Sequence, residues 1–245
     1  QRLERDYPPE VVRMIVYGEP GMMGDGDPVH PGFRHGLHVK PIHQLWSPTR
    51  EVLRGWDFGR RRPAVVFAWR DDLERLRVSR EYLGYNVPLP EFRDAVLKKS
   101  AEWFPKGRFA DFCDASGVQM RDTSAVTSIS ILQDAGLNPT YRQVKDSMAA
   151  ADLVDEEMNL LVEGEPGVTF DPQCSTVIRG MQGGYRIKKT PDGSRVKPVK
   201  DNIHDNAQNA LEFIVMNTTD SMSDNDETWL QEQSIREQRE AGLLG

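Results

Sequence analysis

Three aspartates lie where a folded enzyme could present carboxylates to a divalent cation. Asp57 stands in GWDFG, shortly before the apolar run PAVVFAW, Asp114 directly follows FADFC, and Asp205 lies near the start of a helical pattern. Mg²⁺ and Mn²⁺ prefer hard oxygen ligands. Two-metal phosphoryl transfer needs several such carboxylates from separate elements, with the metals about 3.5–4 Å apart. Together, the three residues predict a divalent-metal site for phosphodiester chemistry.

Each aspartate also has a purely structural interpretation. Asp57 could be a turn residue beside a strand, and Asp114, in DASG, could close an Asx-turn or cap a helix. Asp205 could complement the dipole at the start of its helix. The metal-site prediction therefore depends on whether the fold brings the three carboxylates together.

The elements that would position these residues alternate as in an α/β fold. Three strands with short links predict an antiparallel meander in VLRGWDFG, PAVVFAWR and RLRVSREYLGY. Upstream, PPEVVRMIVYG predicts a short helix and HGLHVKPI a short strand. The later elements are a helix (89–104), a strand (108–116), a helix (125–136), strand PTYRQV, a helix (148–162), strand VTFD, helix CSTVIRGMQGG, a hairpin (186–200) and a helix (202–217). This order predicts a mixed β-sheet flanked by helices.

Composition restricts the class of protein. The 245 residues are 38% hydrophobic and 28% charged, with a net charge of −7, which is typical of a soluble globular protein. No run approaches the roughly 20 apolar residues of a membrane span, so we expect no membrane contact. Cys113 and Cys174 are expected to be reduced thiols. No Gly-Lys-Ser/Thr phosphate loop occurs, so no ATPase activity is expected.

Three parts are expected along the chain. A lead-in segment rich in Gly, Pro and His (1–50) precedes the catalytic domain (51–217), and a polar, mobile tail (218–245) follows it. The first residue is not a methionine. We therefore interpret the chain as a fragment in which the lead-in follows a missing domain.

Basic residues gather in two places despite the negative net charge. Arg60, Arg61 and Arg62 follow the strand that carries Asp57. The hairpin contributes a second group: Lys188, Lys189, Arg195, Lys197 and Lys200. Arginine and lysine provide most protein contacts to phosphates. Both groups are therefore candidates to contact a DNA backbone, although the arginines could instead form a solvated turn and the second group an ordinary charged hairpin.

The ordered set GWDFG, FCDASG and YRI…PVKDNIHDNAQNALEF resembles the C-terminal nuclease domain of tailed-phage terminase large subunits. YPPEVVRMIVYGEPG, GDPVHPGF and VTFDPQCSTVIRGMQGGYRI extend the resemblance over most of residues 7–217. It implies an RNase H-like fold and cutting of concatemeric viral DNA with two Mg²⁺ or Mn²⁺ ions. The implied partners are double-stranded DNA, the terminase ATPase domain, the portal and the small terminase subunit, in the host cytoplasm.

The resemblance also assigns roles to individual residues. Asp57 matches the acid of the first strand, and Asp114 matches the acid at the end of the next catalytic strand. The residue before Ala210-Leu211, where the family often has an aspartate, is Asn209. We expect Asp205, one helical turn earlier on the same face, to be the third catalytic and metal-binding acid. Supporting or alternative ligands are Asn209, His204 and Asp201.

Two other functions remain open. The chain could be a docking and assembly module of the packaging motor, in which the acids are structural and the polar tail binds the partner. It could also be another RNase H-like nuclease, such as a Holliday-junction resolvase. Preference for branched over linear DNA would distinguish the resolvase.

Overall fold

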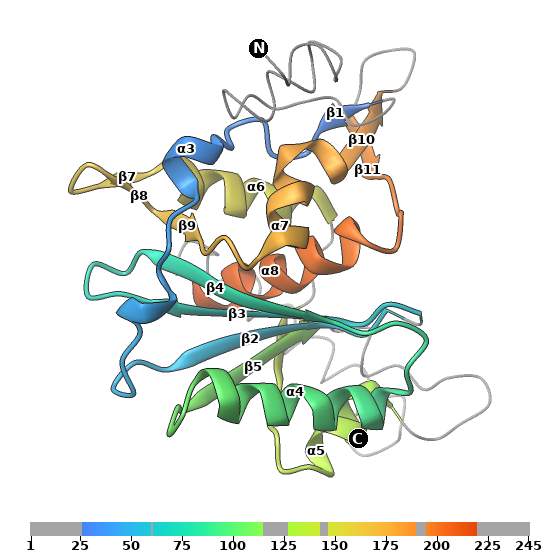
Figure 1. The fold of residues 1–245 in the computed structure, drawn as a ribbon. Helices are drawn as coiled ribbons and strands as arrows, with labels where there is room; N and C mark the ends of the chain where they lie inside the picture. The colour runs from blue at the N-terminus through green and yellow to red at the C-terminus, as the bar shows by residue number, and fades with distance from the viewer. Residues whose placement is uncertain (1–25, 60, 115–126, 143–146, 190–194, 220–245) are drawn as a thin grey trace, which may run out of the picture.

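The centre of the protein is a six-stranded mixed sheet with helices on both faces (Figure 1). The computed structural model describes residues 26–59, 61–114, 127–142, 147–189 and 195–219. The strand order is β6-β5-β2-β3-β4-β9. Their bounds are β2 Val52–Asp57, β3 Ala64–Arg70, β4 Leu76–Leu83, β5 Phe109–Asp114, β6 Thr140–Arg142 and β9 Val168–Phe170.

The meander predicted from the sequence forms the middle of this sheet. β2 pairs antiparallel with β3, and β3 pairs antiparallel with β4. β5 then returns parallel to β2 after a helix, and β6 continues parallel to β5. Because β2 and β5 run in the same direction, their carboxyl ends lie at one edge of the sheet, on the right in Figure 1.

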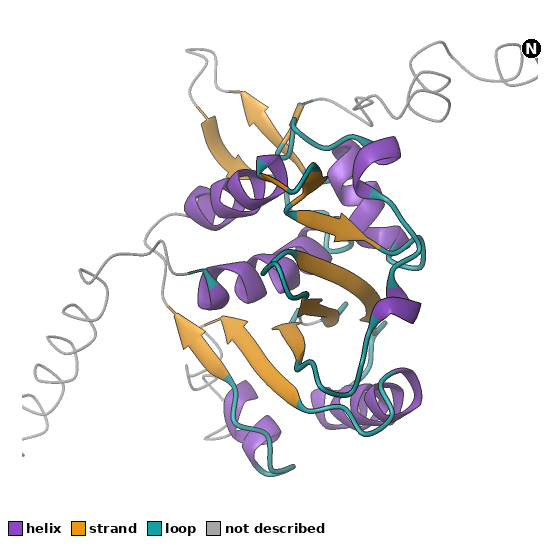
Figure 2. Ribbon diagram, turned by 90° about the vertical axis from the view of Figure 1, so that its left-hand side faces the viewer, coloured by secondary structure: helices purple, strands orange, loops and turns teal. Residues whose placement is uncertain are grey.

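Alternation along the strands divides the apolar side chains between two cores. In β3, Val66 belongs to the core on one face, while Val65 and Phe67 belong to the core on the other. Helices α6 (Ser147–Asn159), α7 (Ser175–Arg179) and α8 (His204–Thr218) cover the first face. Helices α4 (Leu89–Trp103) and α5 (Ser128–Gln133) cover the second. Figure 2 shows this arrangement from the side.

Smaller elements complete the fold beyond α6 and α7. The antiparallel strands β1 (Asp27–Pro28), β10 (Arg186–Lys189) and β11 (Arg195–Pro198) form a second sheet. β7 (Leu161–Val162) and β8 (Glu165–Pro166) form a short ladder. A π-helical turn, η3 (Gly180–Gly184), continues α7. Near its end, Gly183 has a φ of 106°, a positive value that glycine adopts readily and other residues do not.

The described part of the predicted lead-in packs on the sheet. Phe33 is fully buried in the core beneath α6 and α8, and Val29 and Ile42 are also buried. The prediction of a strand in HGLHVKPI is wrong, because the backbone there forms helix α3 (His35–His38), followed by a 3₁₀ turn, η1 (His43–Leu45). A single bridge between Val39 and Phe170 is the extended pairing there.

Most other predicted elements are present, with small changes at their ends. α6 stops at Asn159, and the last residues assigned to that helix form β7 instead. α5 is shorter than expected within the described residues, where Thr127 caps it by accepting from the Ser130 backbone N–H. The helix expected near residues 8–18 and the tail from residue 220 lie outside the described residues.

The predicted fold class is confirmed: the described residues form an RNase H-like mixed sheet flanked by helices. Within the ranges that the structure describes, no helix has both the length and the apolar character needed to cross a bilayer.

Candidate metal centre

Parallel pairing of β2 and β5 places the first two candidate acids side by side. Trp56 in β2 is in register with Cys113 in β5, so the next residues, Asp57 and Asp114, end neighbouring strands at the same level. Asp57 is half-buried, and so is Asp114. A central strand provides a rigid support for a functional carboxylate. The predicted adjacency of these two acids is therefore present in the fold.

A glycine in β2 allows α8 to lie unusually close to the strand. A Cβ added at Gly55 would come within 1.7 Å of the carbonyl oxygen of Ala210 in α8. No side chain larger than hydrogen fits at that distance, so the sequence GWD requires glycine before Trp56. This close approach brings the amide of Asn209 onto the carboxylate of Asp57.

Asp57 has a distinct partner at each carboxylate oxygen. Its Oδ1 accepts a hydrogen bond from the backbone N–H of Gly59 at 2.8 Å, and its Oδ2 accepts from Nδ2 of Asn209 at 3.1 Å. Burial is the main cause that raises the pKa of Asp57 to about 7. The charges of Asp205 and Asp114 raise this pKa further, whereas the two hydrogen bonds lower it.

Asp205 supplies a third carboxylate from the first turn of α8. Its side chain is buried, and its Oδ1 has no hydrogen-bond partner. Burial raises the pKa of Asp205 to about 6, and the neighbouring carboxylate of Asp201 adds to the shift. A buried carboxylate oxygen without a donor is unfavourable in the apo protein, and a bound cation would satisfy it.

Asp201 and His204, the supporting or alternative ligands of the sequence analysis, bind each other at the start of α8. Oδ1 of Asp201 accepts from the backbone N–H groups of Ile203 and His204, both at 2.8 Å, and Oδ2 contacts Nδ1 of His204 at 2.6 Å. Burial acts to raise the pKa of Asp201, but these hydrogen bonds outweigh it and lower the pKa to about 2. These hydrogen bonds cap the first turn of α8, and the assignment of both residues as alternative ligands stays a prediction.

Asn209 lies on Asp57, as a neutral supporting residue would. Its Nδ2 donates to Asp57, while its Oδ1 accepts from the Tyr185 hydroxyl at 3.5 Å. An ionised carboxylate can only accept hydrogen bonds, so the contact with Asp57 fixes which end of the amide faces the aspartate. In this arrangement both polar ends of Asn209 are occupied by protein groups, which favours a supporting role for it.

Glu212 is an acid near the site that the sequence analysis missed. It is buried, and its Oε1 has no hydrogen-bond partner. Burial raises its pKa to about 8, and the charge of Asp57 contributes to the shift. The available signal was spacing: 205, 209 and 212 share one face of a helix. Glu212 lies within NALEFIVM, a run that is typical of a helix face buried in the core, so the sequence alone did not indicate a role for it.

The predicted DNA-contact residues differ in their surroundings. Arg61 is exposed, whereas the guanidinium of Arg62 lies over the ring of Tyr85, 4.8 Å from its centroid. In the hairpin, Lys188, Lys197 and Lys200 are exposed. Arg60 and the side chains of Lys189 and Arg195 lie outside the described residues.

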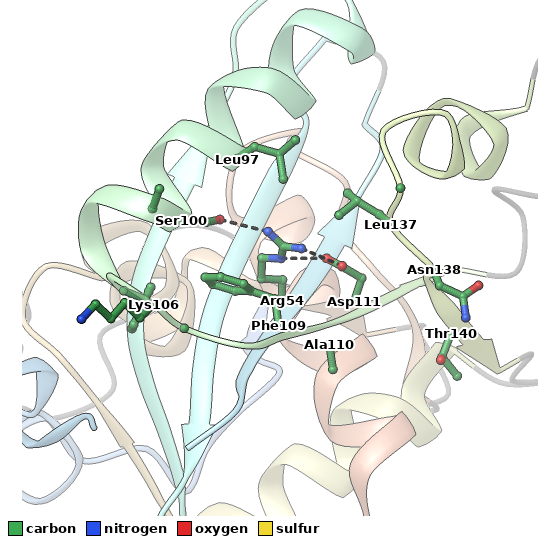
Figure 3. Close-up of a pocket in the computed structure, with 14 residues that line it drawn as sticks. Arg54, Leu97, Ser100, Lys106, Phe109, Ala110, Asp111, Leu137, Asn138 and Thr140 are labelled. Atoms are coloured by element: carbon green, nitrogen blue, oxygen red, sulfur yellow. Dashed lines mark hydrogen bonds and ion pairs between the residues drawn. The ribbon is translucent and has the colours of Figure 1, made fainter. Parts of the chain in front are cut away.

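A separate hollow of about 560 Å³ lies between α4, the start of β5 and residues 136–140 (Figure 3). Its floor is the buried ion pair of Arg54 and Asp111, with donor–acceptor distances of 2.8 and 2.7 Å. Oγ of Ser100 accepts a further hydrogen bond from Nη1 of Arg54 at 3.0 Å. Because these charged groups satisfy one another, the hollow is best explained as a structural feature of the core.

The side chains at the sheet edge suit a divalent cation in type. They are carboxylates from β2, β5 and α8, and a buried oxygen of Asp205 has no partner. Among the described residues, no three His, Cys, Asp or Glu side chains are already close enough to enclose a metal ion. The three catalytic and metal-binding assignments consequently stay predictions.

Comparison with solved structures identifies proteins of the same fold. The large terminase of thermophilic bacteriophage D6E matches with a TM-score of 0.60 and 17% identity, over 89% of this chain and 51% of that one. The P22 large terminase nuclease domain matches with a TM-score of 0.56 and 16% identity, over 77% and 91%. The nuclease domain of the SPP1 large terminase, solved with bound Mn, matches with a TM-score of 0.50 and 17% identity, over 75% and 97%.

The chain spans about half the length of the D6E large terminase. No protein-family model matches it, and neither does any curated protein sequence. The resemblance to terminase nuclease domains seen in the sequence is thus confirmed at the level of the fold.

Proposed function

We propose that this chain is the metal-dependent nuclease domain of a viral DNA-packaging terminase, which hydrolyses phosphodiester bonds of concatemeric double-stranded DNA. The observation that carries the proposal is that Asp57 and Asp114 end neighbouring parallel strands of the sheet, and that the charges of Asp114 and Asp205 both raise the pKa of Asp57. The P22 and SPP1 nuclease domains, which have the same fold, support it.

In this proposal Asp57, Asp114 and Asp205 hold two Mg²⁺ or Mn²⁺ ions. Bound divalent cations supply stabilisation of negative charge on phosphoryl oxygens and lower the pKa of coordinated water. The Asn209 amide and the Gly59 N–H fix the orientation of the Asp57 carboxylate. Exposed Arg61 provides a positive charge near this edge for a phosphate.

The biological setting follows from the same proposal. The partners would be double-stranded DNA, a terminase ATPase domain, the portal and the small terminase subunit, at the procapsid in the host cytoplasm. Residues 51–217 would be the catalytic domain, with 1–50 leading in from the ATPase domain and 218–245 as a tail. This chain would cut DNA but would not hydrolyse ATP.

The alternative function, a docking module of the motor, has one observation in its favour. Asn209, an uncharged residue, lies against Asp57 at the position where the resemblance implies an aspartate, so one carboxylate fewer faces the proposed metals. A module of this kind would bind its motor partner without cutting DNA.

Incubation of supercoiled plasmid with the chain and Mn²⁺, Mg²⁺ or EDTA tests the nuclease proposal. We expect nicking and linearisation with either cation, none in EDTA, and none from Asp57→Asn. Asp134→Asn, which changes an exposed acid after α5, is the matched control and should cut normally. Full activity of Asp57→Asn would refute the site, and preferential cutting of branched DNA would indicate a resolvase.

A further inference from the structure

Two loops at the carboxyl end of β2 are joined into one unit. The backbone N–H of Gly84 donates to the carbonyl of Pro63 at 2.8 Å, and that of Asn86 donates to the carbonyl of Arg61 at 2.7 Å. Asn86 has a positive φ of 49°, a conformation that asparagine tolerates better than most residues. The turn after β4 is therefore fixed against the turn between β2 and β3.

An exposed aromatic side chain lies at the tip of this unit. Tyr85 is 68% exposed, although tyrosine usually buries most of its ring. The guanidinium of Arg62 lies over the ring, with Cζ 4.8 Å from the centroid. Arg61 is exposed beside it in the chain. The result is a flat ring with positive charge around it on the protein surface.

The same loop is connected to the candidate cutting site. Gly59 donates to Asp57 from one end of the loop, and the carbonyl of Arg62 accepts from Nδ2 of Asn206 in α8 at 2.7 Å. These contacts use backbone groups of the loop, so the side chain of Arg62 is left for the ring of Tyr85. Tyr85 and Arg62 consequently have a fixed position relative to Asp57.

We propose that Tyr85 and Arg62 form a contact surface for the sugar-phosphate backbone of duplex DNA beside the cut phosphate. The guanidinium supplies a charge and N–H donors to a phosphate, and the tyrosine supplies a hydroxyl donor and an apolar ring face for a deoxyribose. Such contacts position the duplex without reading its sequence. This inference rests on the proposed nuclease function and assigns it a substrate-binding surface.

DNA affinity without cleavage tests this surface. Binding of a labelled linear duplex is measured in EDTA over a series of salt concentrations, for wild type, Arg62→Gln, Tyr85→Ala and Tyr85→Phe. Arg62→Gln should lower the slope of log K against log salt by about 1, as expected for one lost phosphate contact. Tyr85→Ala should weaken binding about five- to tenfold with little change in slope, and Tyr85→Phe by less.

Leu161→Ala is the matched control, because Leu161 is 67% exposed on the β7–β8 hairpin, on the left of Figure 1. It should bind DNA as wild type does. With Mn²⁺, Tyr85→Ala should raise the DNA concentration that gives half-maximal cleavage by about the factor by which it weakens binding, because the residue binds DNA and does not act on the reacting phosphate. A loss of rate at saturation equal to the loss of affinity would instead indicate damage to the Asp57 site.

The outcomes separate this inference from the proposed function. If wild type cuts DNA and Tyr85→Ala and Arg62→Gln bind like Leu161→Ala, only the contact surface is refuted. If the variants bind more weakly but wild type cuts nothing with any cation, the surface stands and the nuclease proposal fails. If wild type binds no duplex at all, both are overturned.

Discussion

Replacing Asp57 by asparagine should stabilise the protein in the absence of metal. Asp57 has its pKa raised from 3.8 to about 7, mainly by burial, so the folded state binds a proton more tightly than the unfolded chain does. At about 1.36 kcal/mol per pKa unit, the ionised carboxylate costs up to about 4 kcal/mol in the folded state. A residue of the proposed metal site is thus expected to reduce stability.

The sign and the pH range follow from the direction of the shift. Because the pKa is raised on folding, the stability contributed by the protonated acid is present below about pH 4 and is lost as pH rises towards about 7. Asparagine does not titrate, so this loss disappears in the variant. The amide NH₂ of the new asparagine cannot accept a hydrogen bond, so one of the two donors, Asn209 Nδ2 or the Gly59 N–H, loses its partner. This loss offsets about 1–2 kcal/mol of the gain in stability.

The free energy of unfolding is measured by urea titration in EDTA at pH 5 and pH 8. We expect the advantage of Asp57→Asn over wild type to grow by about 2–3 kcal/mol between the two pH values. Asp134→Asn, at an exposed acid, should show no such growth. A variant that is destabilised equally at both pH values would refute the reasoning, since the buried charge would then carry no cost.

Two substitutions test the packing that supports the site. Gly55→Ala should destabilise the fold by about 3 kcal/mol or more, because the new Cβ would lie 1.7 Å from the Ala210 carbonyl oxygen. Gly36→Ala, the control, should be tolerated because there is open space around its Cβ. Urea titration measures both variants, and equal stabilities would contradict the close approach of α8. Arg54→Met should lower the free energy of unfolding by about 3–5 kcal/mol, because it leaves the buried carboxylate of Asp111 without its cation. Adding Asp111→Asn should recover part of that loss. A double variant less stable than Arg54→Met alone would contradict this account.

The sequence predicted the elements whose patterns are long and regular. The meander over residues 52–83 has short runs rich in β-branched and aromatic residues with short links between them, and the helix at 89–103 repeats its apolar positions with helical spacing. The side-by-side position of Asp57 and Asp114 also followed, because both were expected to end strands of one sheet. The segment at 35–38 was mispredicted, since four residues are too few to establish a period.

Features that depend on tertiary contacts were beyond sequence reasoning. Glu212 lies in a run of apolar residues, and only the approach of Asp57 and Tyr185 shows that this buried acid belongs near the site. The donation from Asn209 to Asp57 required the short distance that Gly55 permits. The role proposed for Tyr85 depends on hydrogen bonds between two loops that lie apart in the sequence.

The most direct test of the central claim is a Mn²⁺ titration followed by calorimetry, with wild type, Asp57→Asn, Asp205→Asn and the control Asp134→Asn. The account predicts saturable Mn²⁺ binding by wild type and the control, weakened more than about tenfold in each of the other two variants. A cation placed among these carboxylates needs both charges, so Mn²⁺ affinity equal to wild type in Asp57→Asn and Asp205→Asn would contradict the site.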